Sequence, residues 1–237
     1  IIDEGQDFGA VEWDFIESAL ADDALLYVFM DPNQRAAEPL PSGTILDSLE
    51  PFSLPRNCRS TREIHDLFVR FASDSSPLEC RVRSGRSPEL AWSGTHYAVG
   101  VRAVLTRLVI EEGIRPERVT CLVWAAYMLT EHLAQLAPFY PHEKYPFEEN
   151  GGQFATYRGP ARQVILFPYT TIERFSGLEN DAILVCGLDS IKAERHLADY
   201  YQALSRARSH LVVVAKNEVA AMKLSDLLGL EVQHVGE

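Results

Sequence analysis

The sequence predicts an α/β fold, in which a mostly parallel sheet carries helices on both faces. Short apolar runs of strand length alternate along the chain with segments whose apolar residues recur at helical spacing. The apolar runs are continuous, as in strands that a parallel sheet buries on both faces. With 237 residues, 46% of them hydrophobic, the chain is long enough to bury a core and form one or two domains.

The clearest predicted strand is the run ALLYVFM at 24–30, which contains no polar residue. Other short apolar runs, rich in valine, isoleucine and leucine, have the same strand character. The predicted strands are 1–3, 24–30, 119–123, 163–167, 182–185 and 211–215.

Helices are predicted where apolar residues repeat every three or four positions. The clearest start is the capping-box pattern Ser60-Thr61-Arg62-Glu63, and Gly113 marks an end. The predicted helices cover 11–20, 61–71, 97–112, 127–136, 193–207 and 219–228, and the predicted loops cover 73–94 and 138–160. Five prolines between Pro32 and Pro55 predict a hinge, which divides the chain into residues 1–50 and 51–237.

Composition excludes several classes of protein. No apolar run approaches the roughly 20 residues that cross a bilayer, so a membrane protein is not expected. Four widely spaced cysteines predict a reduced, cytoplasmic setting without a metal cluster. The formal net charge of −12 argues against a broad nucleic-acid surface. The two short basic stretches, 56–62 and 81–86, are predicted to be solvated surface.

Two predicted strands end in polar side chains that suit phosphate chemistry. The first leads into Asp3 and Glu4, and the second is followed by Asp31 and Gln34. Parallel sheets place functional groups at such strand ends. An Asp can hold Mg²⁺, a Glu can activate water, and a Gln can hydrogen-bond to a γ-phosphate. Taken singly, the two segments are more simply an acidic loop and a Pro-Asn turn.

Three further segments are equally ambiguous when each is taken alone. Arg59 lies beside a predicted helix N-terminus, where anions bind, although a surface arginine would fit as well. Residues 171–179 lie between two predicted strands, and residues 201–208 lead into a valine-rich strand. Either could be a polar linker. The order and spacing of all five segments are harder to explain as a set of unrelated loops, turns and linkers.

In series, the five segments resemble motifs II to VI of the UvrD/Rep-like superfamily 1 DNA helicases. DEGQD at 3–7 is similar to the Walker B box DExQD, and DPNQ at 31–34 is similar to motif III. LPRNCRS at 54–60 resembles the L-x-x-N-Y-R-S of motif IV. TIERFSGLE at 171–179 resembles motif V, T-x-H-x-x-K-G-L-E, and YQALSRA at 201–207 resembles motif VI, Y-V-A-L-T-R-A. The resemblance spans nearly the whole chain.

The resemblance implies a P-loop NTPase fold in which two RecA-like domains clamp ATP while single-stranded DNA crosses both. Residues 1–50 would be the end of the first domain. Residues 51–237 would be the second domain, without a large inserted subdomain. The chain opens within motif II and contains no Walker A loop. We therefore expect an N-terminal RecA-like domain outside this chain to complete the ATP site, and no hydrolysis by this chain alone.

The resemblance also implies roles for single residues, with ATP and Mg²⁺ as cofactors. Asp3 would hold Mg²⁺ and Glu4 would polarise the attacking water. Gln34 would contact the γ-phosphate, while Arg59 and Arg206 would stabilise the phosphoryl charge. The expected nucleotide-binding residues are Gln6, Gly177 and Glu179, with Glu179 at the ribose or the phosphate edge.

The sequence departs from the family pattern mainly at positions expected to contact DNA. Cys58 replaces the tyrosine of motif IV, and in motif V Glu173 replaces the histidine and Ser176 the lysine. A carboxylate beside a phosphate backbone would repel it. Motif III continues into 35–37 as Arg-Ala-Ala rather than into base-stacking aromatics. The expected binding of single-stranded DNA is therefore weak.

Two other functions remain open from the sequence. The first is a degenerate, non-catalytic helicase-like module that acts in protein binding or regulation, which the residues Glu173 and Ser176 favour. The second is a metal-dependent nuclease that uses Asp3, Glu4 and Asp7, although no further cluster of carboxylates or histidines accompanies them.

Overall fold

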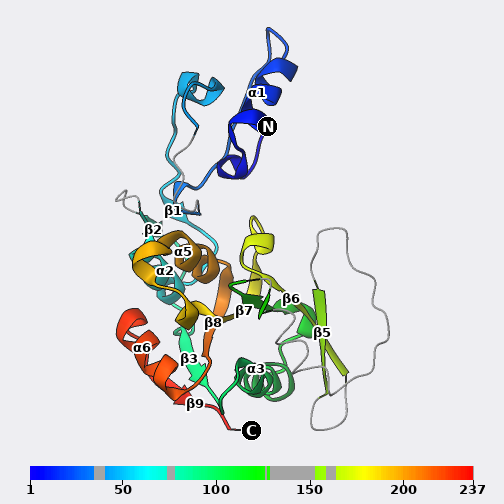
Figure 1. The fold of residues 1–237 in the computed structure, drawn as a ribbon, viewed down its shortest axis with the longest axis vertical. Helices are drawn as coiled ribbons and strands as arrows, with labels where there is room; N and C mark the ends of the chain where they lie inside the picture. The colour runs from blue at the N-terminus through cyan, green and yellow to red at the C-terminus, as the bar shows by residue number, and fades with distance from the viewer. Residues whose placement is uncertain (35–40, 74–77, 126, 129–152, 159–163, 237) are drawn as a thin grey trace.

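The computed structural model describes residues 1–34, 41–73, 78–125, 127–128, 153–158 and 164–236, and it contains the predicted α/β sheet (Figure 1). Seven strands lie in the order β5-β6-β4-β7-β8-β3-β9. The neighbours from β6 to β9 pair in parallel, and β5 is an antiparallel edge. The strands are β3 (Glu89–Trp92), β4 (Val119–Val123), β5 (Gln153–Arg158), β6 (Val164–Thr171), β7 (Asn180–Cys186), β8 (Ala207–Ala215) and β9 (Val232–His234).

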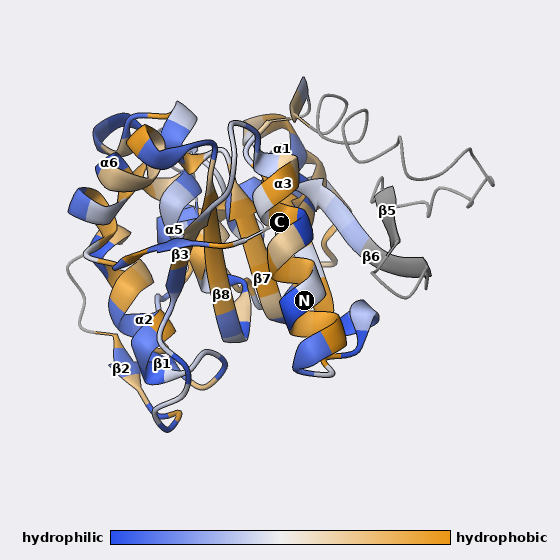
Figure 2. Cartoon of the chain, turned by 90° about the horizontal axis from the view of Figure 1, so that it is seen from below, coloured by the Kyte–Doolittle hydropathy of each residue, from blue (hydrophilic) through white to orange (hydrophobic). Residues whose placement is uncertain are grey.

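Helices cover both faces of this sheet, as the sequence predicted. One face carries α2 (Arg62–Phe68), α5 (Leu197–Ser205) and α6 (Glu218–Leu228). The other carries α3 (Tyr97–Leu105), which continues as one π-helical stretch over Thr106–Glu111. Seen from below, the central strands β7 and β8 are coloured mainly as apolar between these helices (Figure 2).

Alternate side chains of the central strands enter two separate cores. Ile183, Val185 and Val213 pack on the side of α2, α5 and α6, whereas Leu184 and Val214 pack on the side of α3. All five residues of β4 are buried. Burial on both faces explains why these strands appear in the sequence as continuous apolar runs.

Three strands of the central sheet, β3, β5 and β9, lie where the sequence predicted none. The loop predicted over 73–94 contains β3 and the short strand β2 (Glu79–Cys80). The loop predicted over 138–160 contains β5, and β9 follows the last predicted helix. β3 escaped prediction because it is short and begins with Glu89, whose burial depends on an ion pair with the distant Arg107. Most of the predicted helix 127–136 lies outside the described residues.

The N-terminal segment differs from the prediction of two strands. Residues 1–3 and 24–30 form a single parallel bridge, Ile2 to Val28, held by backbone hydrogen bonds of 2.8 and 2.9 Å. Within the described residues no further strand pairs with either segment, so a longer ladder does not form. The helix α1 (Ala10–Ala19) lies between them in sequence, and the whole segment stands at one end of the molecule (Figure 1).

A separate two-stranded parallel sheet joins β1 (Arg56–Asn57) to β2. It lies at the end of the molecule nearer the N-terminal segment (Figure 1). None of the described helices has both the length and the apolar character needed to cross a membrane.

Candidate functional site

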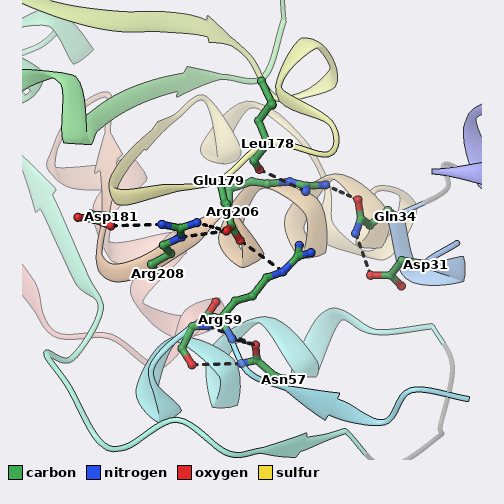
Figure 3. Close-up of polar contacts among 10 residues, drawn as sticks. Asp31, Gln34, Asn57, Arg59, Leu178, Glu179, Asp181, Arg206 and Arg208 are labelled. Carbon is green, nitrogen blue, oxygen red and sulfur yellow. Dashed lines mark hydrogen bonds and ion pairs between the residues drawn. The ribbon is translucent and has the colours of Figure 1, made fainter. Parts of the chain in front are cut away.

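Arg206 is a buried cation at the junction between α5 and β8. It is only 3% exposed. Its guanidinium donates to Gln34 Oε1 and, at 3.4 Å, to the carbonyl of Leu178 (Figure 3). Its Nε–H has no hydrogen-bond partner among the described residues. Buried polar groups are normally paired, so this donor is available to an acceptor that the described residues do not supply.

The charge of Arg206 is balanced only at longer range. Burial is the main effect that lowers the pKa of Arg206, and the neighbouring Arg59 acts in the same direction. The carboxylates of Glu4 and Asp31 oppose this shift. Among the described residues, no carboxylate forms an ion pair with Arg206. A desolvated guanidinium with a spare donor is well suited to bind a phosphate oxygen.

A chain of side-chain contacts connects Arg206 to the acidic loop at the N-terminus. Gln34 accepts from Arg206 and donates through Nε2 to Asp31 Oδ2 at 2.9 Å. The backbone N–H of Asp31 donates to Gln6 Oε1 at 3.0 Å, and Gln6 Nε2 donates to Glu4 Oε2 at 2.5 Å. The segments predicted from motifs II, III and VI therefore meet, although Gln34 and Arg206 are 172 residues apart.

Two left-handed residues meet where the acidic loop contacts the segment 171–179. Glu4 has φ of 51°, the only positive value of a non-glycine residue in the described chain, and Gly177 has φ of 71°. A Cβ atom on Gly177 would lie 3.1 Å from Glu4 Oε1. Beside them, Ser176 Oγ donates to Asp7 Oδ2 at 3.3 Å. Glycine at 177 is thus required both by the backbone and by the approach of Glu4.

Glu179 lies between two arginines at the edge of the site. Its Oε2 is 3.4 Å from Arg59 Nε, and its Oε1 accepts from Arg208 Nε at 2.9 Å (Figure 3). Asn57 Oδ1 accepts from the backbone N–H of Arg59 at 3.0 Å, which orients the loop that carries this arginine. A ribose contact by Glu179 would therefore compete with these two cations.

The predicted site residues are thus partly assembled. Glu4 contacts Gln6, Gln34 contacts Arg206, and Asp31 joins the two pairs. Gly177 lies beside Glu4. Arg59 and Glu179 contact each other. Asp3 is exposed, and its Oδ1 accepts from the N–H of Glu4 at 3.0 Å. Across the described residues, no three His, Cys, Asp or Glu gather to hold a metal, so the nuclease alternative gains no support.

Two residues without a predicted role also belong to the site. Asp31 bridges Gln6 and Gln34, as described above. Tyr201 is buried and hydrogen-bonds to Asp31, and its burial is the main effect that raises the pKa of its hydroxyl. Both residues lie within the quoted motif segments, so their positions were visible in the sequence. Their contact was not, because it joins segments 170 residues apart.

Comparisons with known proteins give distant structural likenesses. No protein-family model matches the chain, and no curated protein matches it. Among solved structures, the chain is similar to the C-terminal domain of a possible DNA helicase from Lactobacillus plantarum WCFS1. The two share 15% identity with a TM-score of 0.49, over 75% of this chain and 98% of that one. A likeness at this level concerns the course of the backbone alone.

Proposed function

We propose that the chain supplies part of the ATP site of a DNA-stimulated superfamily 1 helicase or translocase of the UvrD/Rep-like kind. In this proposal residues 1–50 end a first RecA-like domain and residues 51–237 form the second. The observation that carries it is the contact chain from Glu4 through Gln6, Asp31 and Gln34 to Arg206. It brings carboxylate, amide and guanidinium groups from distant segments into one place, as phosphoryl transfer requires.

The residues fit a nucleotide because the site contains a buried cation with an unused donor. ATP with Mg²⁺ would supply the phosphoryl group that is transferred to water. Asp3 would hold the metal ion, and Glu4 would orient the water and accept its proton. Gln34 and Arg206 would exchange their mutual hydrogen bond for contacts to phosphate oxygens. Arg59 would provide a second guanidinium after leaving Glu179.

The proposed partners are single-stranded DNA and an N-terminal RecA-like domain that completes the ATP site. DNA binding at the segment 171–179 would be weak, since Glu173 places an exposed carboxylate there. The second candidate is a non-catalytic helicase-like module. The Ser176 to Asp7 hydrogen bond favours it, because a serine that fastens the acidic loop stands where the family has a lysine.

The test is ATP hydrolysis by the full natural polypeptide, measured with and without single-stranded DNA. Replacing Arg206 with alanine should lower the rate by about 10³ to 10⁵, as for other arginine fingers. Arg206→Lys keeps the charge but not the planar fork, so it should recover little activity. Arg115→Ala, at an exposed arginine outside the site, is the control and should hydrolyse normally. Absence of hydrolysis in the unmodified polypeptide, with or without DNA, would favour the non-catalytic module.

A further inference from the structure

The two short basic stretches of the sequence form one surface in the structure. β1 and β2 pair in parallel with Arg56 opposite Glu79, and the N–H of Arg81 donates to the carbonyl of Asn57 at 3.0 Å. Farther along, the N–H of Gly85 donates to Glu63 Oε2 at 2.7 Å. The stretch 81–86 therefore runs beside 56–63, and arginines that are about 20 residues apart in the chain become neighbours.

Strand geometry turns Arg56 and Arg81 to the same side. Side chains alternate along a strand, so Glu79 and Arg81, whose N–H continues the pairing with β1, point to one face. The side chain of Arg56 shares this face, because Arg56 Nε lies 3.6 Å from Glu79 Oε2. Arg83 follows two residues after Arg81, beyond a bend at Val82, and is exposed. Cys80 points the other way and is partly buried. Arg62 is exposed at the start of α2, next to this face.

The charge of this surface is unusual for the chain. Residues 56–86 contain seven arginines, no lysine and four acidic residues, which gives a formal charge of +3 in a protein of −12. Arg62, Arg81 and Arg83 are exposed and form no ion pair with any described residue. Carboxylates are plentiful elsewhere in the chain, yet none in the described residues pairs with these three arginines, which leaves them available to an external anion. The exclusive use of arginine favours phosphate, which its planar fork can bind in a bidentate way.

An exposed aromatic residue precedes the arginines closely in sequence. Phe52, four residues before Arg56, is 85% exposed. An aromatic ring next to a row of cations is the combination that binds single-stranded nucleic acid, because the ring stacks on a base while the cations follow the backbone. An acidic peptide would use the arginines but would not need the ring.

We propose that this arginine surface binds single-stranded DNA, through phosphate contacts from the arginines and base stacking on the ring; its residues are Phe52, Arg56, Arg62, Arg81 and Arg83. The choice of DNA as the polyanion rests on the proposed function, whereas the surface itself is defined by the arginines. It would allow the chain to hold DNA although its motif V residues are poorly suited to do so.

The test measures binding of a labelled oligothymidylate to the full natural polypeptide by fluorescence anisotropy without nucleotide. The variant Arg81→Gln/Arg83→Gln should bind roughly tenfold more weakly in moderate salt. Its slope of log affinity against log salt should fall by about 1.4, since each phosphate contact contributes about 0.7 for single strands. The control Arg115→Gln/Arg195→Gln changes the net charge equally at exposed positions elsewhere and should leave the slope unchanged.

Two single variants sharpen this test. Phe52→Ala should weaken binding about fivefold or more without changing the salt slope, because stacking releases no counterions. Glu79→Gln removes a carboxylate from the surface and should tighten binding.

Equal losses in the two double variants, or no loss in either, would overturn the proposal. So would displacement of the DNA by polyglutamate at the same charge concentration, which would indicate a surface for acidic peptides. The measurement does not depend on hydrolysis, so an inactive ATP site and a failed DNA surface would be told apart.

Discussion

The central sheet and the N-terminal segment are held by different interactions. β4 is buried along its whole length, and most of β7 and β8 is buried as well. In the N-terminal segment Ile1 is 90% exposed, Leu25 81% and Val11 77%, and Trp13 is a rare buried side chain. This segment reaches the rest of the molecule through polar contacts such as those of Gln34 and Asp7. Folding stability therefore resides in the sheet, while the geometry of the site depends on the more weakly held region.

The largest expected difference between the two regions comes from a pair of leucines. Leu184 is fully buried in β7, so Leu184→Ala should lower the free energy of unfolding by about 2–5 kcal/mol through lost burial and a cavity. Leu25 is exposed, so Leu25→Ala should change it by less than about 0.5 kcal/mol. Urea denaturation of the 237-residue chain measures both. Similar losses of folding stability in the two variants would show that residues 24–30 pack into a core in solution. The contrast between a buried sheet and a weakly held N-terminal segment would then be wrong.

A glycine pair tests whether the contact at Glu4 matters for the site. Gly177 and Gly113 have the same φ of 71°, but only at Gly177 would a Cβ atom meet Glu4, since nothing lies within 4 Å at Gly113. Alanine at either position should cost roughly 1–2 kcal/mol of folding stability from the left-handed backbone. Only Gly177→Ala should also displace the acidic loop.

Hydrogen exchange separates these two effects of the glycine variants. The amide of Gly5 donates to the carbonyl of Phe29 at 2.8 Å, so it reports on the acidic loop. It should exchange faster in Gly177→Ala than in Gly113→Ala, and ATP hydrolysis by the full polypeptide should fall only in the former. Identical exchange in the two variants would show that Glu4 and Gly177 are not coupled.

The contrast between the buried sheet and the exposed N-terminal segment also explains which strands the sequence could predict. β4 was predicted with its bounds, 119–123, because a strand buried on both faces leaves a continuous apolar run. β3 was not predicted, because Glu89 interrupts the pattern and its burial is supported by ion pairs with Arg86 and with Arg107, which folding brings to it. The strands predicted at 1–3 and 24–30 were wrong because an apolar run indicates burial, and no neighbouring strand in the described residues provides it.

Within the site, the motifs predicted which segments matter but not how they contact one another. Arg206 and Gln34 were identified from their motifs, and their mutual hydrogen bond follows from the fold. The ion pairs of Glu179 with Arg59 and Arg208 could not be predicted from a local sequence pattern, because the three residues are far apart in the chain. The arginine surface was missed for the same reason, since each basic stretch is short by itself and only the β1–β2 pairing joins them.

The sheet also contains a polar region, near the start of β8. His210 is partly buried there, and its Nδ1 lies 2.9 Å from Ser209 Oγ. Burial is the main effect that lowers the pKa of His210 below its usual 6.5, and the neighbouring Arg86 acts in the same direction. The carboxylates of Glu112, Glu89 and Asp181 oppose this shift without reversing it. The folded protein therefore favours the neutral form of this imidazole.

The smallest expected effect is a pH dependence that arises from His210. Above the usual pKa of about 6.5 the imidazole is neutral in both states, and its contribution to stability is constant. As the pH falls through that value toward the lower folded pKa, the unfolded state binds the proton first, so stability is lost. His210→Gln should therefore show a shallower loss of stability as the pH falls below about 6.5 in urea denaturation. His96→Gln, at an exposed histidine, should keep the original slope. If His96→Gln, rather than His210→Gln, reduced the dependence of folding stability on pH, the loss of stability in acid would arise from a surface histidine and not from His210.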